Sequence, residues 1–348
     1  MERDLRISNA KGLLIFLVVF GHLIELSKYS NYELFVFIYA FHMPLFIFIS
    51  GYLAKRVKVS KIINLILLYL IFQTIFNYFR YLMGTYETIP FHYGTPQFHL
   101  WYLVSLGIWY AAAFLLLKLK LTKCVKWVIF IVIVAISFIS RWYASEILVL
   151  VKNNLFVGFD TYTLSYQRTL SFAPFFFAGF FINKEWFDKI SNLLRNQTLK
   201  VIGSIAIITF AFVFIENTNR IENAFRGSFG GVMFLDEQNL GAFSVVVLAH
   251  YLIATILCIL ILNWVSKGNT ALSYWGDASL TIFLFHPVFV FIIQKHELLS
   301  LVKPNTQIVI CIFISTLICY VLASKLFVKI TNPLCNPYFI IKNIKNKG

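Results

Sequence analysis

The sequence predicts an all-α integral membrane protein with about ten transmembrane helices and with both termini in the cytoplasm. Of the 348 residues, 59% are hydrophobic and only 13% are charged, which is too apolar a composition for a soluble domain. The apolar residues gather in runs that approach the roughly 20 residues a helix needs to cross the hydrocarbon core. The charged residues between these runs are distributed unequally between alternate connections, as a membrane topology requires.

The predicted spans form a single polytopic membrane domain, residues 1–348. They lie near residues 11–27, 33–53, 62–82, 98–117, 126–142, 168–183, 199–216, 242–263, 278–295 and 306–327. The sixth is the weakest, because Pro174 and Gly179 lie inside it. A broken or shortened helix is expected there, packed against protein or a water-filled cavity.

The charge distribution supports this topology. With the N-terminus inside, most of the 30 lysines and arginines fall in inside connections, and most of the 15 acidic residues fall outside. Nearly all of the net charge of +15 therefore lies on the cytoplasmic face. Topology and contact with anionic membrane lipid explain these cations, while a sharper alternative is that some of them hold an anionic cytosolic ligand. No interleaving of aromatic and basic residues indicates nucleic acid.

The five cysteines show no CxxC pairing and lie mostly in or beside apolar runs. We expect them to act as small hydrophobic residues and not as a disulfide framework or a metal site. No small-residue cleavage pattern follows the first apolar run, so the first helix is expected to be retained as the insertion signal.

Ionisable side chains inside the first two spans are the main candidates for chemistry. Lys11 and His22 are eleven residues apart, or three helical turns, so they lie on one face about 16 Å apart along the axis. Glu25 is one turn beyond His22, and His42 in the second span reaches a comparable depth. Glu25 and His42 both stay open as the partner of His22. Packing against neighbouring phenylalanines is the alternative role of His42.

A histidine in an apolar cavity is a good general base for taking a proton from a hydroxyl that attacks an acyl group. The sequence contains no GxSxG nucleophile elbow, no HExxH, no P-loop and no Rossmann glycine fingerprint. Nucleotide hydrolysis, metalloprotease chemistry and dinucleotide redox are therefore poorly supported.

Three predicted outside loops, residues 84–97, 143–167 and 217–241, are rich in aromatic residues with scattered carboxylates such as Asp160. Surfaces of this kind suit carbohydrate, whose ring faces stack on aromatic side chains and whose hydroxyls need acceptors. An interfacial aromatic belt explains any single tyrosine equally well.

Several motifs resemble those of the acyltransferase 3 family of bacterial membrane acyltransferases, and within it the sugar O-acetyltransferases of the fucose 4-O-acetylase type. The motifs are RISNAKGLLIFLVVFGHL at 6–23, FHMPLFIFISGYL at 41–53, HLWYLVSL at 99–106, the aromatic run with a proline at 168–183, and SLTIFLFHP at 279–287. The resemblance covers the chain from end to end.

This resemblance implies an enzyme of the bacterial cytoplasmic membrane. It would move an acetyl or another short acyl group from cytosolic acetyl-CoA to a hydroxyl of a cell-surface glycan or of a lipid-linked sugar precursor. His22 matches the essential histidine of the family, with Glu25 or His42 as its catalytic partner.

The resemblance also implies two binding regions. Lys11 matches a basic position of the family, and Lys55 and Arg56 fall near its cytoplasmic basic motif, which reads KRVK here. These cations are expected to bind CoA phosphates. Trp101 matches the aromatic residue at the start of the fourth span, and with His99 and Asp160 it is a candidate for acceptor binding. His99 and Trp101 could equally be interface anchors.

Two other functions are open at this point. A transporter or exporter of a polysaccharide precursor would use the buried histidines as a proton relay, but the spans contain almost no carboxylate except Glu25, which favours an enzyme. A non-catalytic assembly subunit would give His22 no role. The acceptor sugar, the modified hydroxyl, the acyl group and the oligomeric state stay open, with a homo-oligomer as one alternative.

Overall fold

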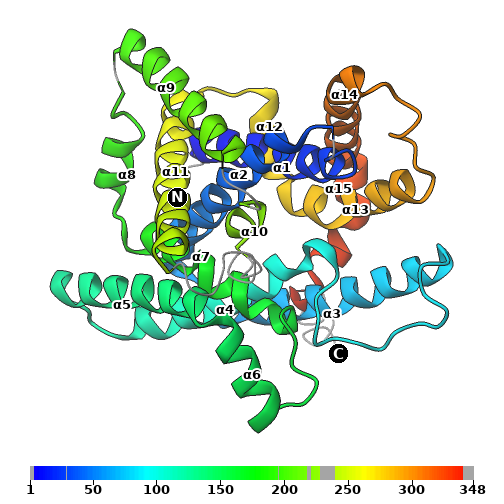
Figure 1. The fold of residues 1–348 in the computed structure, drawn as a ribbon, viewed down its shortest axis with the longest axis horizontal. Coiled ribbons are helices and arrows are strands. Elements are labelled where there is room, and N and C mark those ends of the chain that lie inside the picture. Colours follow the sequence, from blue (N-terminus) through cyan, green and yellow to red (C-terminus); the bar gives the residue numbers. More distant parts are fainter. Residues whose placement is uncertain (1–3, 29, 195, 218–220, 228–239, 340–348) are drawn as a thin grey trace. The chain divides into compact units, whose positions relative to one another are not determined.

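A computed structural model describes residues 4–28, 30–194, 196–217, 221–227 and 240–339 (Figure 1). Every regular element in these ranges is a helix. The chain is therefore an all-α integral membrane protein, as the composition predicts. It divides into two compact units, Met1–Ile49 with Ile182–Arg226 and Leu240–Thr331, and Ser50–Phe181 with Gly227–Asn239 and Asn332–Gly348.

The first unit contains the N-terminal helices and most of the C-terminal half of the chain. Its helices are α1 (Leu5–Glu25), the greater part of α2 (Tyr32–Leu53), α8 (Lys184–Ile190), α9 (Gln197–Glu216), α10 (Glu222–Phe225), α11 (Leu240–Trp264), α12 (Ala271–Asp277), α13 (Ser279–Lys295), α14 (Pro304–Leu322) and the first part of α15 (Lys325–Cys335).

The second unit contains the helices between α2 and α8. They are η1 (Ala54–Arg56), α3 (Val59–Leu82), η2 (Phe98–Leu100), α4 (Trp101–Lys118), α5 (Lys123–Trp142), α6 (Ala144–Asn154), η3 (Thr163–Ser165) and α7 (Tyr166–Phe181).

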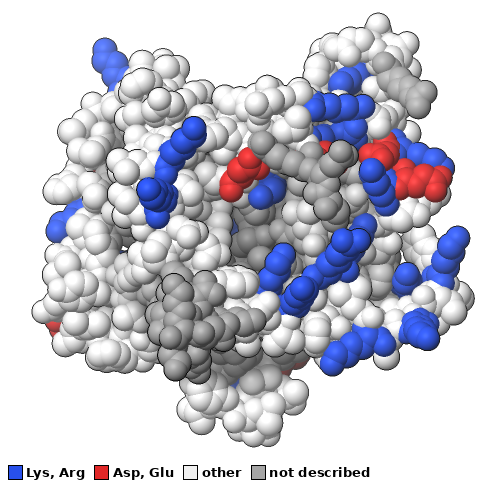
Figure 2. All heavy atoms as spheres, turned by 180° about the vertical axis from the view of Figure 1, so that it is seen from behind, with Lys and Arg blue, Asp and Glu red and all other residues white. Residues whose placement is uncertain are grey.

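Among the described residues, eight helices are long and apolar enough to cross a membrane, and a ninth is obtained if α12 and α13 count as one span. These two helices meet at an angle of 86°. The predicted sixth span lies on α7, which has only 16 residues and contains Pro174. Figure 2 shows broad areas without any charged side chain, as lipid contact requires. The expectation of about ten spans in a single domain stays a prediction.

Helix α1 begins where the chain supplies a cap. The carboxylate of Asp4 accepts hydrogen bonds from the backbone N–H groups of Arg6 and Ile7, at 3.0 and 3.4 Å. The side chain thereby satisfies donors that the first turn of a helix leaves unpaired. From this start α1 runs through the first unit in contact with α12, α13 and α14 (Figure 1).

The contact between α1 and α12 brings two backbones together. A Cβ atom on Gly12 would overlap the carbonyl of Leu272, and a Cβ atom on Gly276 would overlap the carbonyl of Ser8. Only glycine fits at these two positions, so the small residues set how closely α12 lies on α1.

The linker between α11 and α12 is tied to α1 through Asn9, which is fully buried. Its amide nitrogen donates to the carbonyls of Ser266 and Gly268 at 2.8 and 2.7 Å, and its amide oxygen accepts from the hydroxyl of Thr270 at 2.6 Å. The buried amide of Asn9 is thus satisfied by three hydrogen bonds to a single linker.

In the second unit, side chains of α3 form hydrogen bonds with the backbone of the loop that precedes α4. Gln73 donates to the carbonyls of His92 and Thr95 and accepts from the N–H of Gln97. Asn77 donates to the carbonyl of Pro90. These side chains hold the loop in one conformation, because irregular backbone needs partners of its own.

We predict that Gly12→Ala destabilises the protein, because the added methyl group meets the Leu272 carbonyl and overpacking costs about 1–3 kcal/mol. Thermal unfolding of the purified protein in detergent measures the effect. Gly203→Ala in α9 is the matched control, since nothing lies within 4 Å of its Cβ position, and it should be neutral or slightly stabilising. Equal midpoints for the two variants would contradict the close contact between α1 and α12.

Candidate active site

The last turn of α1 carries the predicted His22 and Glu25. Their side chains are 14% and 21% exposed, and His22 Nδ1 lies 3.6 Å from Glu25 Oε2. The spacing of three residues places them on one helix face. Both groups therefore lie inside protein, beside each other, at the end of the helix opposite to Asp4.

Tyr39 of α2 joins these two residues. Its hydroxyl donates to Glu25 Oε2 at 2.9 Å and lies 3.1 Å from His22 Nδ1. The ring of Tyr39 meets the His22 ring edge-on, with the centroids 6.3 Å apart. Tyr39 is 8% exposed, so its hydroxyl is largely shielded from water, and hydrogen bonds inside protein are electrostatically stronger than in water.

Arg226, which follows α10, completes the cluster from the other side. Its Nη2 lies 2.8 Å from Glu25 Oε1, and its guanidinium lies 5.4 Å from the centroid of the Tyr39 ring. Burial alone would lower the pKa of Arg226, but the charges of Glu25 and Glu222 help to outweigh burial, and this pKa is raised above its ordinary value. The guanidinium therefore stays charged and can hold Glu25 ionised.

Two further histidines surround this cluster. His286 of α13 stacks on His22, with the ring centroids 5.5 Å apart and the planes 15° apart, and its Nδ1 lies 2.9 Å from the carbonyl of Ile282. His42 is 2% exposed, and its Nδ1 lies 2.6 Å from the carbonyl of Ile38. The His42 ring meets the Tyr39 ring edge-on at 4.9 Å. Of the two candidate partners of His22, Glu25 shares its hydrogen-bond cluster and His42 touches that cluster through Tyr39.

The three cations expected to bind a donor fall in different parts of the chain. Lys11 is half-buried in α1, and Asp277 at the end of α12 is the acidic group whose charge acts on it. Lys55 and Arg56 form part of η1 in the second unit. The Nζ of Lys55 lies 3.9 Å from the centroid of the Tyr52 ring, and Arg56 is exposed.

The residues predicted to bind an acceptor all lie in the second unit. Trp101 stacks on Phe172 with centroids 5.7 Å apart, and the guanidinium of Arg168 lies 5.1 Å from its ring centroid. His99 is 2% exposed, with its ring 5.3 Å from that of Phe76.

Asp160 serves a local turn. It accepts hydrogen bonds from the N–H of Tyr162 and the hydroxyl of Thr163, each at 2.8 Å. A short acidic side chain commonly stabilises a turn in this way. Its other carboxylate oxygen accepts from the hydroxyl of Thr95 at 3.5 Å.

Sequence reasoning missed Tyr39, Arg226 and the stacking of His286 on His22. Arg226 carried a usable signal, because it is a cation in a connection predicted to lie outside, where the positive-inside rule disfavours cations. Tyr39 carried none, since one tyrosine in an aromatic helix does not stand out. Its role depends on how α2 packs against α1.

Chemically, the cluster is arranged for proton transfer. Tyr39 and Glu25 approach the Nδ1 side of His22, and a hydrogen bond there sets which ring nitrogen carries the proton. A carboxylate beside an imidazole also stabilises the imidazolium that forms when the ring accepts a proton. The fold and this cluster together define a multi-pass membrane protein with an acid–base group inside it.

Residues 4–324 match the family described as "Acyltransferase domain". The match covers nearly the whole chain, so the protein belongs to this acyltransferase family, the acyltransferase 3 family that its motifs indicated.

Two relatives carry the same printed name. The chain is 28% identical to Nodulation protein NolL of Sinorhizobium fredii over 237 residues, which is 61% of this chain and 57% of that protein. It is 44% identical to Nodulation protein NolL of Mesorhizobium japonicum over 66 residues, 17% of this chain and 18% of that one. The chain thus spans less than two thirds of the length of these relatives. No solved structure matches the chain.

We predict that Arg226→Gln lowers the free energy of unfolding by about 1–3 kcal/mol, because the partly buried carboxylate of Glu25 loses its charged partner. Glu25→Gln combined with Arg226→Gln should cost less than the sum of the single changes, and a double-mutant cycle by denaturant unfolding measures this. Lys189→Gln is the control, since the exposed pair of Lys189 with Glu185 is worth about 0.5 kcal/mol or less. Additive single costs would show that Glu25 and Arg226 do not interact.

Proposed function

We propose that the protein is a membrane O-acyltransferase. It moves an acetyl or another short acyl group from cytosolic acyl-CoA to a hydroxyl of a cell-surface glycan or of a lipid-linked sugar, with His22 as the general base. Membership of the acyltransferase family supports the acyl transfer, and the topology that the sequence predicts supports a bacterial cytoplasmic membrane with the donor on its cytosolic side.

The observation that carries the proposal is the connected set of Arg226, Glu25, Tyr39 and His22. Successive contacts of 2.8, 2.9 and 3.1 Å lead from the guanidinium to the imidazole. This set would orient His22 with Nδ1 facing Tyr39 and Glu25, so that Nε2 can accept the proton of the attacking hydroxyl. A hydroxyl with a pKa far above neutrality needs such a base at the moment of attack.

The reaction balances with this one residue. The acceptor oxygen forms a bond to the acyl carbon, the carbon–sulfur bond of the donor breaks, and the proton taken by His22 passes to the departing sulfur. The imidazolium that exists between these two transfers is stabilised by Glu25, which stays ionised because Arg226 faces it.

The donor would approach along α1 from the end that carries Lys11. With a rise of 1.5 Å per residue, Lys11 and His22 are about 16 Å apart along the axis. A phosphate group held near Lys11 would need an extended arm to bring a thioester to His22, and the pantetheine arm of an acyl-CoA supplies one.

We predict that His22→Gln lowers the rate of acyl transfer by at least about 100-fold, the usual contribution of a general base. The assay is mass spectrometry of glycan acceptors after incubation with acetyl-CoA and the purified protein. His296→Gln removes an exposed histidine and should keep full activity. A purified protein that carries sugar across the membrane without acylating it, and that loses this transport in His22→Gln, would support an exporter instead.

We predict that Tyr39→Phe lowers kcat about tenfold and leaves the KM for the donor unchanged, because it removes one buried hydrogen bond that orients His22. Tyr320→Phe is the control, since Tyr320 is 69% exposed on α14. If the KM for the donor rises and kcat stays the same, Tyr39 contacts the donor and does not orient the base.

A further inference from the structure

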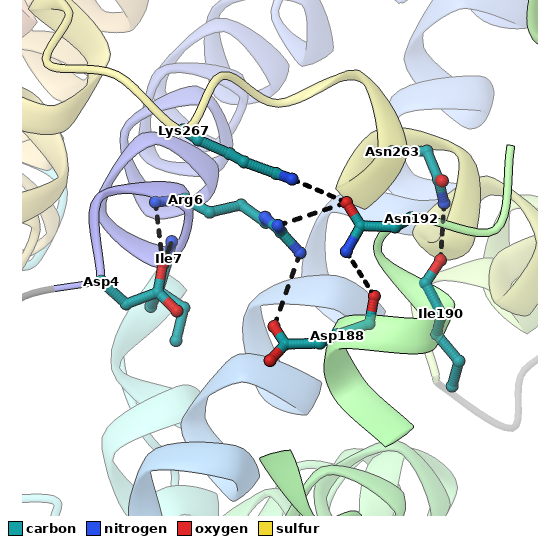
Figure 3. A network of polar contacts seen from close by, with 8 residues as sticks. All are labelled: Asp4, Arg6, Ile7, Asp188, Ile190, Asn192, Asn263 and Lys267. Carbon is teal, nitrogen blue, oxygen red and sulfur yellow. Dashed lines mark hydrogen bonds and ion pairs between the residues drawn. The ribbon is translucent and has the colours of Figure 1, made fainter. Parts of the chain in front are cut away.

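A second polar cluster lies at the opposite end of α1 from His22. It brings together Arg6 of α1, Asp188 of α8, Asn192 just beyond α8, and Lys267 in the linker between α11 and α12 (Figure 3). All four belong to the first unit. The charge distribution of the sequence predicts that this end of α1 faces the cytoplasm.

Two cations share one neutral acceptor in this cluster. Lys267 Nζ donates to Asn192 Oδ1 at 2.8 Å, and Arg6 Nη2 approaches the same oxygen at 3.5 Å (Figure 3). The amide is held in this orientation because its nitrogen donates to the carbonyl of Asp188 at 2.6 Å. An amide oxygen carries no net charge, so it does not neutralise either cation.

The guanidinium of Arg6 is buried and incompletely satisfied. Its side chain is 8% exposed, and its ion pair with Asp188 Oδ1 measures 3.9 Å. Charge-assisted hydrogen bonds of arginine are normally 2.7–2.9 Å long, and Nη1 has no hydrogen-bond partner among the described residues. The hydroxyl of Ser191, beside Asn192 in the chain, is likewise buried without a partner in that part of the structure.

The neighbouring carboxylates do not meet this need. Asp4 uses its carboxylate to cap the backbone of α1 at Arg6 and Ile7. Asp188 is 47% exposed and stands off at 3.9 Å. A buried arginine and a nearby lysine that converge on one neutral oxygen are suited to a multiply charged oxyanion, whose oxygens can accept from both.

We propose that Arg6 and Lys267 bind a phosphate group. The phosphate belongs either to a soluble ligand, such as the acyl donor, or to the headgroup of an anionic lipid. A role of this cluster in binding the acyl donor rests on the proposed function. Its affinity for phosphate does not.

The test uses the full-length protein in phosphatidylcholine nanodiscs, with inorganic pyrophosphate as the probe and calorimetry as the readout. Lys267→Gln should weaken pyrophosphate binding about tenfold, which corresponds to the loss of one charged contact. Lys267 is exposed, so this variant is expected to fold. Asn192→Asp, which places a carboxylate against both cations, should abolish binding.

Lys329→Gln is the matched control, because it removes another exposed lysine, from α15. Its affinity for pyrophosphate should stay within about twofold of the original protein. Absence of pyrophosphate binding in the original protein, unchanged affinity in Lys267→Gln, or an equal loss in Lys329→Gln would each overturn the phosphate site.

Two further comparisons identify the source of the phosphate and distinguish a failure of the phosphate site from a failure of the proposed function. If phosphatidylglycerol in the nanodiscs suppresses the Lys267-dependent binding, the phosphate is that of a lipid; if binding persists, it is that of a soluble ligand. Pyrophosphate binding is measured independently of acyl transfer. If the protein acylates nothing but its pyrophosphate affinity depends on Lys267, the phosphate site is supported and the proposed function fails. If the protein is an active acyltransferase but its pyrophosphate affinity is unchanged in Lys267→Gln, the phosphate site is contradicted and the proposed function stands.

Discussion

The ion pair between Glu25 and Arg226 is the interaction on which the cluster around His22 depends. A carboxylate enclosed by protein at the end of an apolar helix is costly to keep charged without a partner. Arg226 supplies that partner at 2.8 Å, and Glu25 then accepts the Tyr39 hydroxyl that lies beside His22. If Arg226 were lost, Glu25 would lose its charged partner, and the arrangement of hydrogen bonds around the imidazole would change.

Helix α1 connects this cluster with the cationic cluster at its other end. Arg6 and His22 are 16 residues apart, which corresponds to about 24 Å of helix. The glycine contacts with α12 and the amide contacts of Asn9 fix α1 within the first unit between these two points. One rigid helix thus sets the separation between a region suited to phosphate and a region suited to proton transfer.

The all-α membrane fold was predictable, because long apolar runs and unequal loop charges are local properties of the chain. The pairing of His22 with Glu25 was also accessible, since both residues lie on one turn of one helix. Tyr39 and Arg226 were not, because their contacts depend on how separate helices pack. The same holds for the contacts of Arg6, because the sequence alone suggests only that this cation marks the cytoplasmic side of the membrane. The turn contacts of Asp160 and the packing of His99 against Phe76 also depend on the fold, and the role of both residues in acceptor binding stays a prediction.

The contacts of Asn9 also bear on the order in which the protein is made. Its partners lie 257 to 261 residues further along the chain, and the nascent chain leaves the ribosome from its N-terminus. During synthesis, α1 therefore enters the bilayer long before the segment that pairs with its buried amide exists. Until that segment arrives, the amide must rely on lipid headgroups, water or the insertion machinery. The docking of α12 on α1, a helix inserted much earlier, is therefore a late step of assembly.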